Sequence, residues 1–272
     1  MRFVKGHGTE NDFVIVPDPD GSLDLTPSLV AALCDRRAGI GADGVLRVVR
    51  SKVIGRDDLG AEWFMDYRNA DGSVAEMCGN GVRVFARYLV DAGLAAPGDL
   101  PIGTRAGVRT ASLGPTGDVT VEMGAPRILG EGRAVLSGRS YVGLRVSIGN
   151  PHLACVIDEP VAGLDLTRAP DVEAAVFPAG VNVELYRPVG VGRVEMRVYE
   201  RGSGETRSCG TGAVATAVAA AHAEGRETGA WEIAVPGGVV TVTLDGATSF
   251  LSGPAVFVAE GEIRPELLAG IG

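Results

Sequence analysis

Two stretches of the chain each join a polar, glycine-containing loop to a long run of small and apolar residues. In the first stretch, apolar residues recur at the helical spacing of three and four positions, namely Val82, Phe85, Ala86, Leu89 and Val90. Gly93 then supplies a stop signal. In the second stretch, residues 212–224 are rich in alanine and valine and apolar on all sides, which is typical of a fully buried helix. The pattern therefore predicts two central helices.

Short apolar segments before and after these helices alternate or cluster as strands do, with turn residues between them. The expected strands are 3–5, 13–16, 45–49, 62–68, 108–113, 119–123, 141–148, 153–157, a segment holding Asn182, 231–234, 239–244 and 257–259. The sequence GHGTEND at 6–12 is expected to be a turn. A helix is predicted over 27–35 with Thr26 as its N-cap, and a short helical stretch is predicted after Thr167, ending near Val176.

Similar features recur at similar offsets along the chain, which predicts a duplicated half. Asn11 precedes Asn150 by 139 residues, and Cys78 precedes Cys209 by 131. A helix that is apolar on all faces needs a sheet around it. We therefore expect an α+β fold of two pseudo-symmetric, barrel-like β domains, each wrapped around a central helix. The expected halves are 1–124, joined by the C-terminal segment 255–272, and 125–254, with a crossing in the glycine- and proline-rich segment 124–138 and the active site in the cleft between the halves.

Composition narrows the functional class and the compartment. The chain has 272 residues, 46% hydrophobic and 22% charged, which is typical of a globular protein with ample material for a core. Its net charge of -9 and its lack of a basic cluster argue against nucleic acid as a partner. The N-terminal sequence resembles neither a signal peptide nor a transit peptide, and no run is long enough to span a bilayer. We therefore expect a cytoplasmic location without membrane association.

Cys78 and Cys209 occupy matching settings at the start of the two predicted helices. Asn69 precedes the first by nine residues, and Glu200 precedes the second by nine. The first N–H groups of a helix lack partners within the helix and favour negative charge, so a thiol there is expected to have a lowered pKa. One such cysteine is more often a small buried hydrophobe. Two in the same setting favour a chemical role.

Two thiols beside two helix ends suit racemisation at an amino-acid α-carbon. The helix ends bind a carboxylate, one thiolate removes the α-proton, and the thiol on the other face returns a proton. Four cysteines without C-x-x-C spacing indicate neither a zinc site nor a disulfide framework. Lys5 and Lys52 are the only lysines, and neither has the setting of a pyridoxal phosphate site. No cofactor and no metal are therefore expected.

The motifs HGTENDF, RRAGIGADG, NADGSVAEMCGNG, NPH, VNVEL and YERGSGETRSCGTG appear in this order and cover most of the chain. In these motifs the chain resembles the diaminopimelate epimerase family, cofactor-independent enzymes of lysine and peptidoglycan-precursor synthesis. The resemblance implies that Cys78 and Cys209 are the acid/base pair and that the enzyme is a homodimer whose substrate is the small molecule diaminopimelate. Some family members have a substrate-contacting glutamine where this chain has Gly44.

The resemblance also implies roles for residues around the cysteines. His152 and Glu200 would tune the cysteine pKa values. The positions implied to bind substrate are Asn11, Asn69, Gly79, Asn80, Asn150, Asn182, Glu200, Arg201, Gly210 and Thr211. Among them, Arg201 would pair with the distal carboxylate of the substrate.

Several alternatives stay open from the residues alone. The asparagines lie in turn sequences, where asparagine is common for backbone reasons. His152 could be an ordinary hydrogen-bonded histidine, and Arg201 with Glu200 a surface pair. The two cysteines could form a disulfide, which cytoplasmic conditions disfavour. Another two-cysteine racemase, acting on proline or hydroxyproline, and a small-molecule or zinc binder on the same fold are the rival functions.

Overall fold

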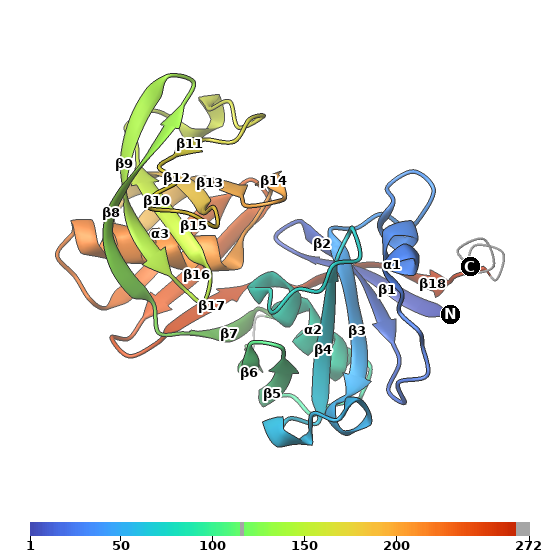
Figure 1. Ribbon diagram of the computed structural model, residues 1–272. Coiled ribbons are helices and arrows are strands. Elements are labelled where there is room, and N and C mark those ends of the chain that lie inside the picture. The colour runs from blue at the N-terminus through green and yellow to red at the C-terminus, as the bar shows by residue number, and fades with distance from the viewer. Residues whose placement is uncertain (115–116, 265–272) are drawn as a thin grey trace. The chain divides into compact units, whose positions relative to one another are not determined.

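The chain folds into two compact units, described here from a computed structural model that covers residues 1–114 and 117–264 (Figure 1). Unit 1 comprises Met1–Val121 together with the segment that begins at Pro254, and unit 2 comprises Glu122–Gly253. Each unit consists mostly of strands around one long helix. The first unit is therefore built from both ends of the chain, and the second from its middle.

In its described residues, unit 1 contains the α-helices α1 (Pro27–Cys34) and α2 (Gly79–Asp91) and 3-10 turns at Ser51–Ile54 and Asp57–Leu59. Its strands are β1 (Arg2–Gly8), β2 (Asn11–Pro17), β3 (Gly44–Arg50), β4 (Trp63–Asn69), β5 (Asp99–Thr104), β6 (Gly107–Leu113), β7 (Val119–Gly124), within which the chain passes into unit 2, and β18 (Val256–Glu262). As the sequence predicts, Thr26 caps α1, because its side chain accepts a hydrogen bond from the backbone N–H of Leu29.

Unit 2 contains the helix α3 (Gly210–Ala223) and a 3-10 turn at Val161–Gly163. Its strands are β8 (Arg127–Leu136), β9 (Arg139–Ser147), β10 (Pro151–Val156), β11 (Asp171–Val172), β12 (Asn182–Gly190), β13 (Arg193–Glu200), β14 (Gly204–Thr206), β15 (Gly229–Val235), β16 (Gly238–Leu244) and β17 (Ser249–Gly253).

The two units share one order of strand pairing. In unit 1, β18 pairs antiparallel with β1, and β1 with β2; β2 and β3 are parallel, β3 and β4 antiparallel, β4 and β5 parallel, and β5, β6 and β7 antiparallel. In unit 2 the same directions run through β8, β9, β10, β12, β13, β15, β16 and β17. The long helix follows β4 in one unit and the β13–β14 hairpin in the other. This match confirms the predicted pseudo-symmetry.

The long helices form the centre of each unit. Helix α2 contacts β1 to β6, and α3 contacts β9, β10, β12, β13 and β15 to β17. Every residue of α3 from Gly210 to Ala221 is buried, which confirms the interpretation of its all-apolar sequence. The sheet stays open among the described strands, so the units are barrel-like without being closed barrels. A separate apolar cluster in unit 1 packs α1 against β2 and β3.

Some sequence-based expectations about elements are wrong. The helix expected to end near Val176 is absent, and residues 165–176 hold only the short β11 and turns. Pro170 explains this, because it lacks an N–H and disfavours the helical conformation in the residue before it. Much of the expected crossing at 124–138 is the strand β8, and the strands β5, β13, β14 and β17 were not expected.

The turn expected at 6–12 is only two residues long. Thr9 and Glu10 connect β1 and β2 with positive φ values of 50° and 60°. Positive φ is uncommon for residues other than glycine, and for a β-branched threonine it is a true outlier. Thr9 is 1% exposed, and its hydroxyl accepts a hydrogen bond from Arg83. His7 and Asn11 therefore lie on strands, with Asn11 at the first position of β2. No helix in the described part of the chain is both long and apolar enough to cross a membrane.

Candidate active site

Each of the two predicted cysteines is the N-cap of the long helix in its unit. Cys78 caps α2 with φ -140° and ψ 118°, and Cys209 caps α3 with φ -124° and ψ 116°. Each Sγ atom accepts a hydrogen bond of 3.4 Å from the backbone N–H three residues on, that of Gly81 or Gly212. The two thiols therefore meet the same backbone geometry, as their matching sequence settings predict. Cys34, Cys155 and Cys209 are free thiols.

The two thiols differ in their surroundings. Cys78 is half-buried, whereas Cys209 is 6% exposed. Burial, and then the carboxylates of Glu200 and Glu184, raise the pKa of the Cys209 thiol well above its ordinary value. The expectation of a lowered pKa is therefore wrong for Cys209, because desolvation and two nearby carboxylates outweigh the helix end.

In unit 1, the side chain of Asn11 connects Cys78 to a carboxylate. The thiol donates to Oδ1 of Asn11 at 3.5 Å, and Nδ2 of Asn80 donates to the same oxygen at 3.3 Å. On its other side, Nδ2 of Asn11 donates to Oδ2 of Asp43 at 2.8 Å. Asn80 is 1% exposed, and its own Oδ1 accepts from Arg83 at 2.6 Å. Both amides are therefore held in one orientation next to the thiol.

A charge network lies behind Asp43. Arg36 donates to Oδ1 of Asp43 at 2.7 Å and also binds both carboxylate oxygens of Asp12, which Lys5 contacts at 2.6 Å. Burial opposes ionisation of Asp12, but the hydrogen bonds from Arg36 and Lys5 hold its pKa far below the ordinary value. Burial raises the pKa of Asp43 despite its hydrogen bond from Asn11.

In unit 2, a chain of hydrogen bonds leads from a buried carboxylate to Cys209. Oε1 of Glu184 lies 2.7 Å from Nδ1 of His152, and Nε2 of that ring lies 3.0 Å from Oδ1 of Asn150. Nδ2 of Asn150 donates to Oγ1 of Thr211 at 3.3 Å, and this hydroxyl lies 3.5 Å from Sγ of Cys209. Strands β10 and β12 and the first turn of α3 thus bring these side chains together.

The remaining predicted residues of unit 2 lie at the ends of β12 and β13. Oδ1 of Asn182 accepts from the backbone N–H of Arg201 at 2.9 Å, and its Nδ2 donates to the carbonyl of Pro151 at 3.2 Å. The Arg201 side chain is exposed and donates to the carbonyl of Ala179 at 2.9 Å. The buried arginine that we expected for the distal carboxylate is therefore not found, because Arg201 is exposed. Glu200, the last residue of β13, accepts from the Thr206 hydroxyl.

In unit 1, Asn69 ends β4 and donates to the hydroxyl of Ser73 at 2.9 Å. Gly44 begins β3, directly opposite Asn69 in the antiparallel pair. A Cβ atom at Gly44 would lie 2.4 Å from the carbonyl oxygen of Arg68 and 2.7 Å from the Tyr67 ring. This packing excludes any side chain at Gly44, so the glutamine contact of some relatives has no equivalent at this position.

The helix starts hold the other predicted positions. Gly79 and Asn80 open α2, and Gly210 and Thr211 open α3. Sequence reasoning missed two carboxylates in these networks, Asp43 and Glu184. Glu184 had one signal, since it is the charged residue within the largely apolar strand sequence VNVELY. Among the described residues there is no group of three or more His, Cys, Asp or Glu that could hold a metal ion.

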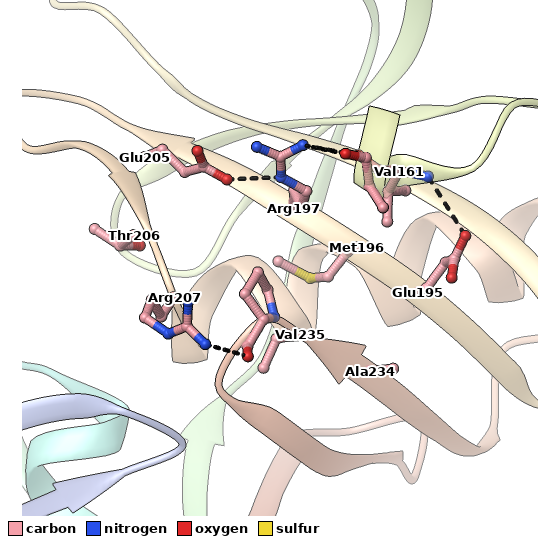
Figure 2. Close-up of a pocket in the computed structure, with 11 residues that line it drawn as sticks. Val161, Glu195, Met196, Arg197, Glu205, Thr206, Arg207, Ala234 and Val235 are labelled. Atoms are coloured by element: carbon pink, nitrogen blue, oxygen red, sulfur yellow. Dashed lines mark hydrogen bonds and ion pairs between the residues drawn. The ribbon is translucent and has the colours of Figure 1, made fainter. Parts of the chain in front are cut away.

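A cavity of about 570 Å³ in unit 2 is formed by other residues (Figure 2). Its lining includes Arg197 and Glu205, which are paired at 2.6 Å, and Arg207, which donates to the carbonyl of Pro236 at 2.8 Å. Arg197 also donates to the carbonyl of Val161 at 2.9 Å. None of the predicted site residues lines this cavity, and its arginines are already partnered. The cavity therefore does not compete with the cysteines as a candidate active site.

Comparison with known proteins shows which family the chain resembles. The family model described as diaminopimelate epimerase matches residues 3–129 and 144–258. A diaminopimelate epimerase of Thermobifida fusca (strain YX) is 60% identical over 271 residues, covering 97% of this chain and 98% of the relative. A diaminopimelate epimerase of Mycolicibacterium smegmatis is 53% identical over 283 residues, covering 97% of each chain.

Solved structures of more distant proteins share the fold. A Bacillus anthracis phenazine biosynthesis protein of the PhzF family matches with a TM-score of 0.69 at 17% identity, covering 97% of this chain and 99% of that one. A hydroxyproline epimerase from Agrobacterium vitis matches with a TM-score of 0.66 at 16% identity, covering 97% and 90%. At such identities the likeness concerns the fold alone.

Proposed function

This chain belongs to the diaminopimelate epimerase family, and we propose that it is an isomerase that interconverts LL-2,6-diaminopimelate and meso-2,6-diaminopimelate. The observation that carries the mechanism is the repeated N-cap cysteine, with the same dihedral region and the same backbone hydrogen bond in both units. Inversion of a carbon centre needs one group to remove a proton and another to supply one from the opposite face. Cys78 and Cys209 are the pair for this task.

The proton balance of the proposed reaction is simple. In one direction, the thiolate of one cysteine takes the α-proton and becomes a thiol, while the other thiol gives its proton to the α-carbon and becomes a thiolate. In the reverse direction the roles exchange. The raised pKa of Cys209 favours its thiol form, which is the form that acts as the acid. This step uses neither cofactor nor metal.

The helix starts supply the electrostatic part of catalysis. Gly79 and Asn80 in α2, and Gly210 and Thr211 in α3, occupy first-turn positions, where backbone N–H groups face outward along the helix axis. These groups bind the reacting carboxylate and stabilise the negative charge that develops on it when the α-proton leaves. The short polar side chains beside them then fix the orientation of the substrate.

The substrate contacts follow from the resemblance and from the networks around the thiols. Asn11, Asn69, Asn150 and Asn182 hydrogen-bond the amino and carboxylate groups, while Arg201 pairs with the distal carboxylate. His152 and Glu200 tune the proton affinity of Cys209, which follows Glu200 by nine residues, with β14 between them. The Arg201 side chain is exposed and donates to the backbone carbonyl of Ala179. On binding, it exchanges this partner for the distal carboxylate of the substrate.

The proposal extends to the setting of the enzyme. Diaminopimelate is an intermediate of lysine and peptidoglycan-precursor synthesis, so we place the enzyme in the cytoplasm, where these precursors are made. A homodimer is the expected assembly from the family resemblance. No membrane or nucleic-acid partner is part of the proposed function.

The decisive experiment follows the α-proton. The protein is incubated with LL-diaminopimelate in deuterated water, and the isomers and their deuterium content are measured over time. We expect meso-diaminopimelate that carries solvent deuterium at the inverted centre, because the returning proton comes from the second thiol. Proline and hydroxyproline serve as control substrates. Inversion without solvent deuterium would contradict the two-base mechanism, and inversion of proline alone would contradict the substrate.

A further inference from the structure

The strands behind the two cysteines carry different residues at matched positions. In the parallel pair of unit 1, Phe13 of β2 lies opposite Gly44 of β3; in unit 2, His152 of β10 lies opposite Asn182 of β12. His152 thus occupies the place of Phe13. Two residues beyond Gly44 and Asn182 come Leu46 and Glu184, which are also equivalent.

Leu46 and Glu184 pack against the same point of the two helices. A Cβ atom on Gly81 of α2 would lie 3.3 Å from Cδ2 of Leu46, and one on Gly212 of α3 would lie 2.8 Å from Oε1 of Glu184. Both glycines are the third residue of their helix, three positions after the cysteine. Glu184 therefore fills, with a carboxylate, a site that unit 1 fills with a leucine side chain.

Burial of a glutamate and a histidine costs desolvation free energy that apolar side chains in the same place would not. The side chains of His152 and Glu184 are both 0% exposed, and burial raises the pKa of Glu184. Oε2 of Glu184 has no hydrogen-bond partner among the described residues. Apolar side chains of similar volume usually replace such a pair without loss of stability. In unit 1, Phe13 and Leu46 occupy the equivalent positions, so the fold does not require a histidine and a glutamate there. The presence of His152 and Glu184 in unit 2 therefore needs another explanation.

The directions of the hydrogen bonds indicate that reason. Asn150 presents Oδ1 to the ring, so Nε2 of His152 must carry a hydrogen. At Nδ1, either a charged ring donates to the Glu184 carboxylate or a protonated Glu184 donates to a neutral ring. Both forms hold the same number of protons and no net charge. With the Asn150 carbonyl occupied by the ring, its NH₂ group faces Thr211, whose hydroxyl hydrogen is left for Sγ of Cys209.

We propose that Glu184 is a positioning residue for the Cys209 half of the active site. By anchoring Nδ1 of His152, it keeps the ring donating through Nε2, holds Asn150 in one orientation and directs the Thr211 hydroxyl hydrogen to the sulfur. The inference rests on the proposed function, because it assigns Glu184 a part in that reaction. When Cys209 gives its proton to the α-carbon, its thiolate is met by two donors, the N–H of Gly212 and the O–H of Thr211.

The test substitutes Glu184 in two ways. In Glu184→Leu, which copies the residue of unit 1, Nδ1 of His152 loses its anchor, and kcat/KM should fall by about tenfold to a hundredfold. In Glu184→Gln, the amide NH₂ donates to Nδ1 and leaves the hydrogen on Nε2, so kcat/KM should stay close to that of the unsubstituted chain. The matched control is Glu232→Leu, on an exposed position of β15 in the same unit, with activity expected to be unchanged.

A spectroscopic readout separates positioning from general damage. The chain has three histidines, so the ¹⁵N-labelled ring of His152 is assigned by substituting the other two. Its Nε2–H resonance should be sharp in the unsubstituted chain and in Glu184→Gln, and broadened by exchange in Glu184→Leu. Unchanged kcat/KM in Glu184→Leu would overturn the proposal. Equal loss in Glu184→Leu and Glu184→Gln would also overturn it, since the carboxylate charge would then be what matters.

A double variant tests whether the pair serves only the fold. His152→Phe combined with Glu184→Leu installs the residues of unit 1 in unit 2. Its melting temperature should equal or exceed that of the unsubstituted chain, while its epimerisation should be lost. A melting temperature well below that of the unsubstituted chain would mean that the pair is a structural requirement and would refute the positioning role. If the unsubstituted chain itself left diaminopimelate unchanged, the proposed function would fail, and the His152 resonances would still report on the anchor.

Discussion

The two units use one arrangement of strands and helix, yet they surround their cysteines with different chemistry. In unit 1, Cys78 is half-buried and hydrogen-bonded to Asn11, and the apolar side chains of Leu46 and Phe13 pack near Gly81 in the first turn of α2. In unit 2, Cys209 is buried, and the polar chain from Glu184 through His152 lies behind it. The two units thus share the backbone setting of the thiol and differ in how deeply it is buried and in which side chains surround it.

The largest expected effect comes from removing either thiol. We predict that Cys78→Ser and Cys209→Ser each lower epimerisation by at least about 10²–10⁴-fold, because serine is far less acidic and leaves one face without a competent acid or base. Cys34→Ser is the control, since Cys34 is a buried thiol of unit 1 whose pKa burial raises to about 12. Steady-state epimerisation of LL-diaminopimelate is the assay. Near-normal turnover of either variant would contradict the hypothesis that both cysteines take part in proton transfer.

A second effect concerns the far end of the substrate. Arg201→Lys should lower kcat/KM for diaminopimelate by roughly tenfold, because a point charge does not reproduce the bidentate geometry of a guanidinium with a carboxylate. Arg193→Lys, another exposed arginine of unit 2, is the control. Lysine, which lacks the distal carboxylate, should be epimerised much more slowly than diaminopimelate. Equal rates for lysine and diaminopimelate would refute the role of Arg201 in substrate choice.

The matched glycines Gly81 and Gly212 compare the packing behind the two thiols. A Cβ atom at Gly212 meets the fixed Oε1 of Glu184 at 2.8 Å, whereas one at Gly81 meets a leucine methyl group at 3.3 Å. We predict that Gly212→Ala lowers the free energy of unfolding by about 1–3 kcal/mol through overpacking. In Gly81→Ala, the gain in helix propensity, up to about 1 kcal/mol, offsets a small shift of Leu46. Denaturant unfolding measures both, and equal losses would contradict the comparison.

The smallest expected effect is a difference in acid sensitivity. In unit 1, burial opposes the ionisation of Asp18, Asp66 and Asp12, but hydrogen bonds from arginine side chains outweigh it. The pKa values of these three carboxyl groups are therefore lowered below their ordinary value. A lowered folded-state pKa gives stability that is present above the unfolded value and lost as the pH falls through the folded value. Glu184, which lies against α3 in unit 2, has a raised pKa, so acid relieves a cost there, whereas Glu159, Asp165 and Asp245 of the same unit have lowered pKa values. Asp43 is the exception in unit 1.

Hydrogen exchange, corrected for the intrinsic rate at each pH, measures this difference. Between pH 6 and pH 3, the opening free energy of β3 and β4 should fall by roughly 1–2 kcal/mol more than that of α3. Asp66→Asn should reduce the pH dependence of unit 1 and leave that of α3 unchanged. A larger fall in α3 than in β3 and β4 would contradict the opposite signs assigned to Glu184 and to the carboxylates Asp18 and Asp66.

The sequence by itself determined the central helices, most strands and the repeat. Helical periodicity at Val82 to Val90 and the all-apolar run at 212–224 left no other regular structure for those segments, and both proved to be the buried helices α2 and α3. Because a cysteine directly before a helix has its position fixed by local geometry, the N-cap setting of Cys78 and Cys209 was also predictable. The motifs around them were specific enough to indicate the family.

Only the tertiary structure decided how deeply each cysteine is buried and which charged groups lie near it. The helix-end argument alone predicts a lowered pKa, and for Cys209 the sum of burial and two carboxylates reverses it. Glu184 is 25 residues from Cys209 in sequence and reaches it only because β12 packs against the first turn of α3. Asp43 and Asn11 meet through the parallel pairing of β2 and β3 in the same way. Desolvation and charge interactions depend on such long-range packing, which local sequence patterns do not encode.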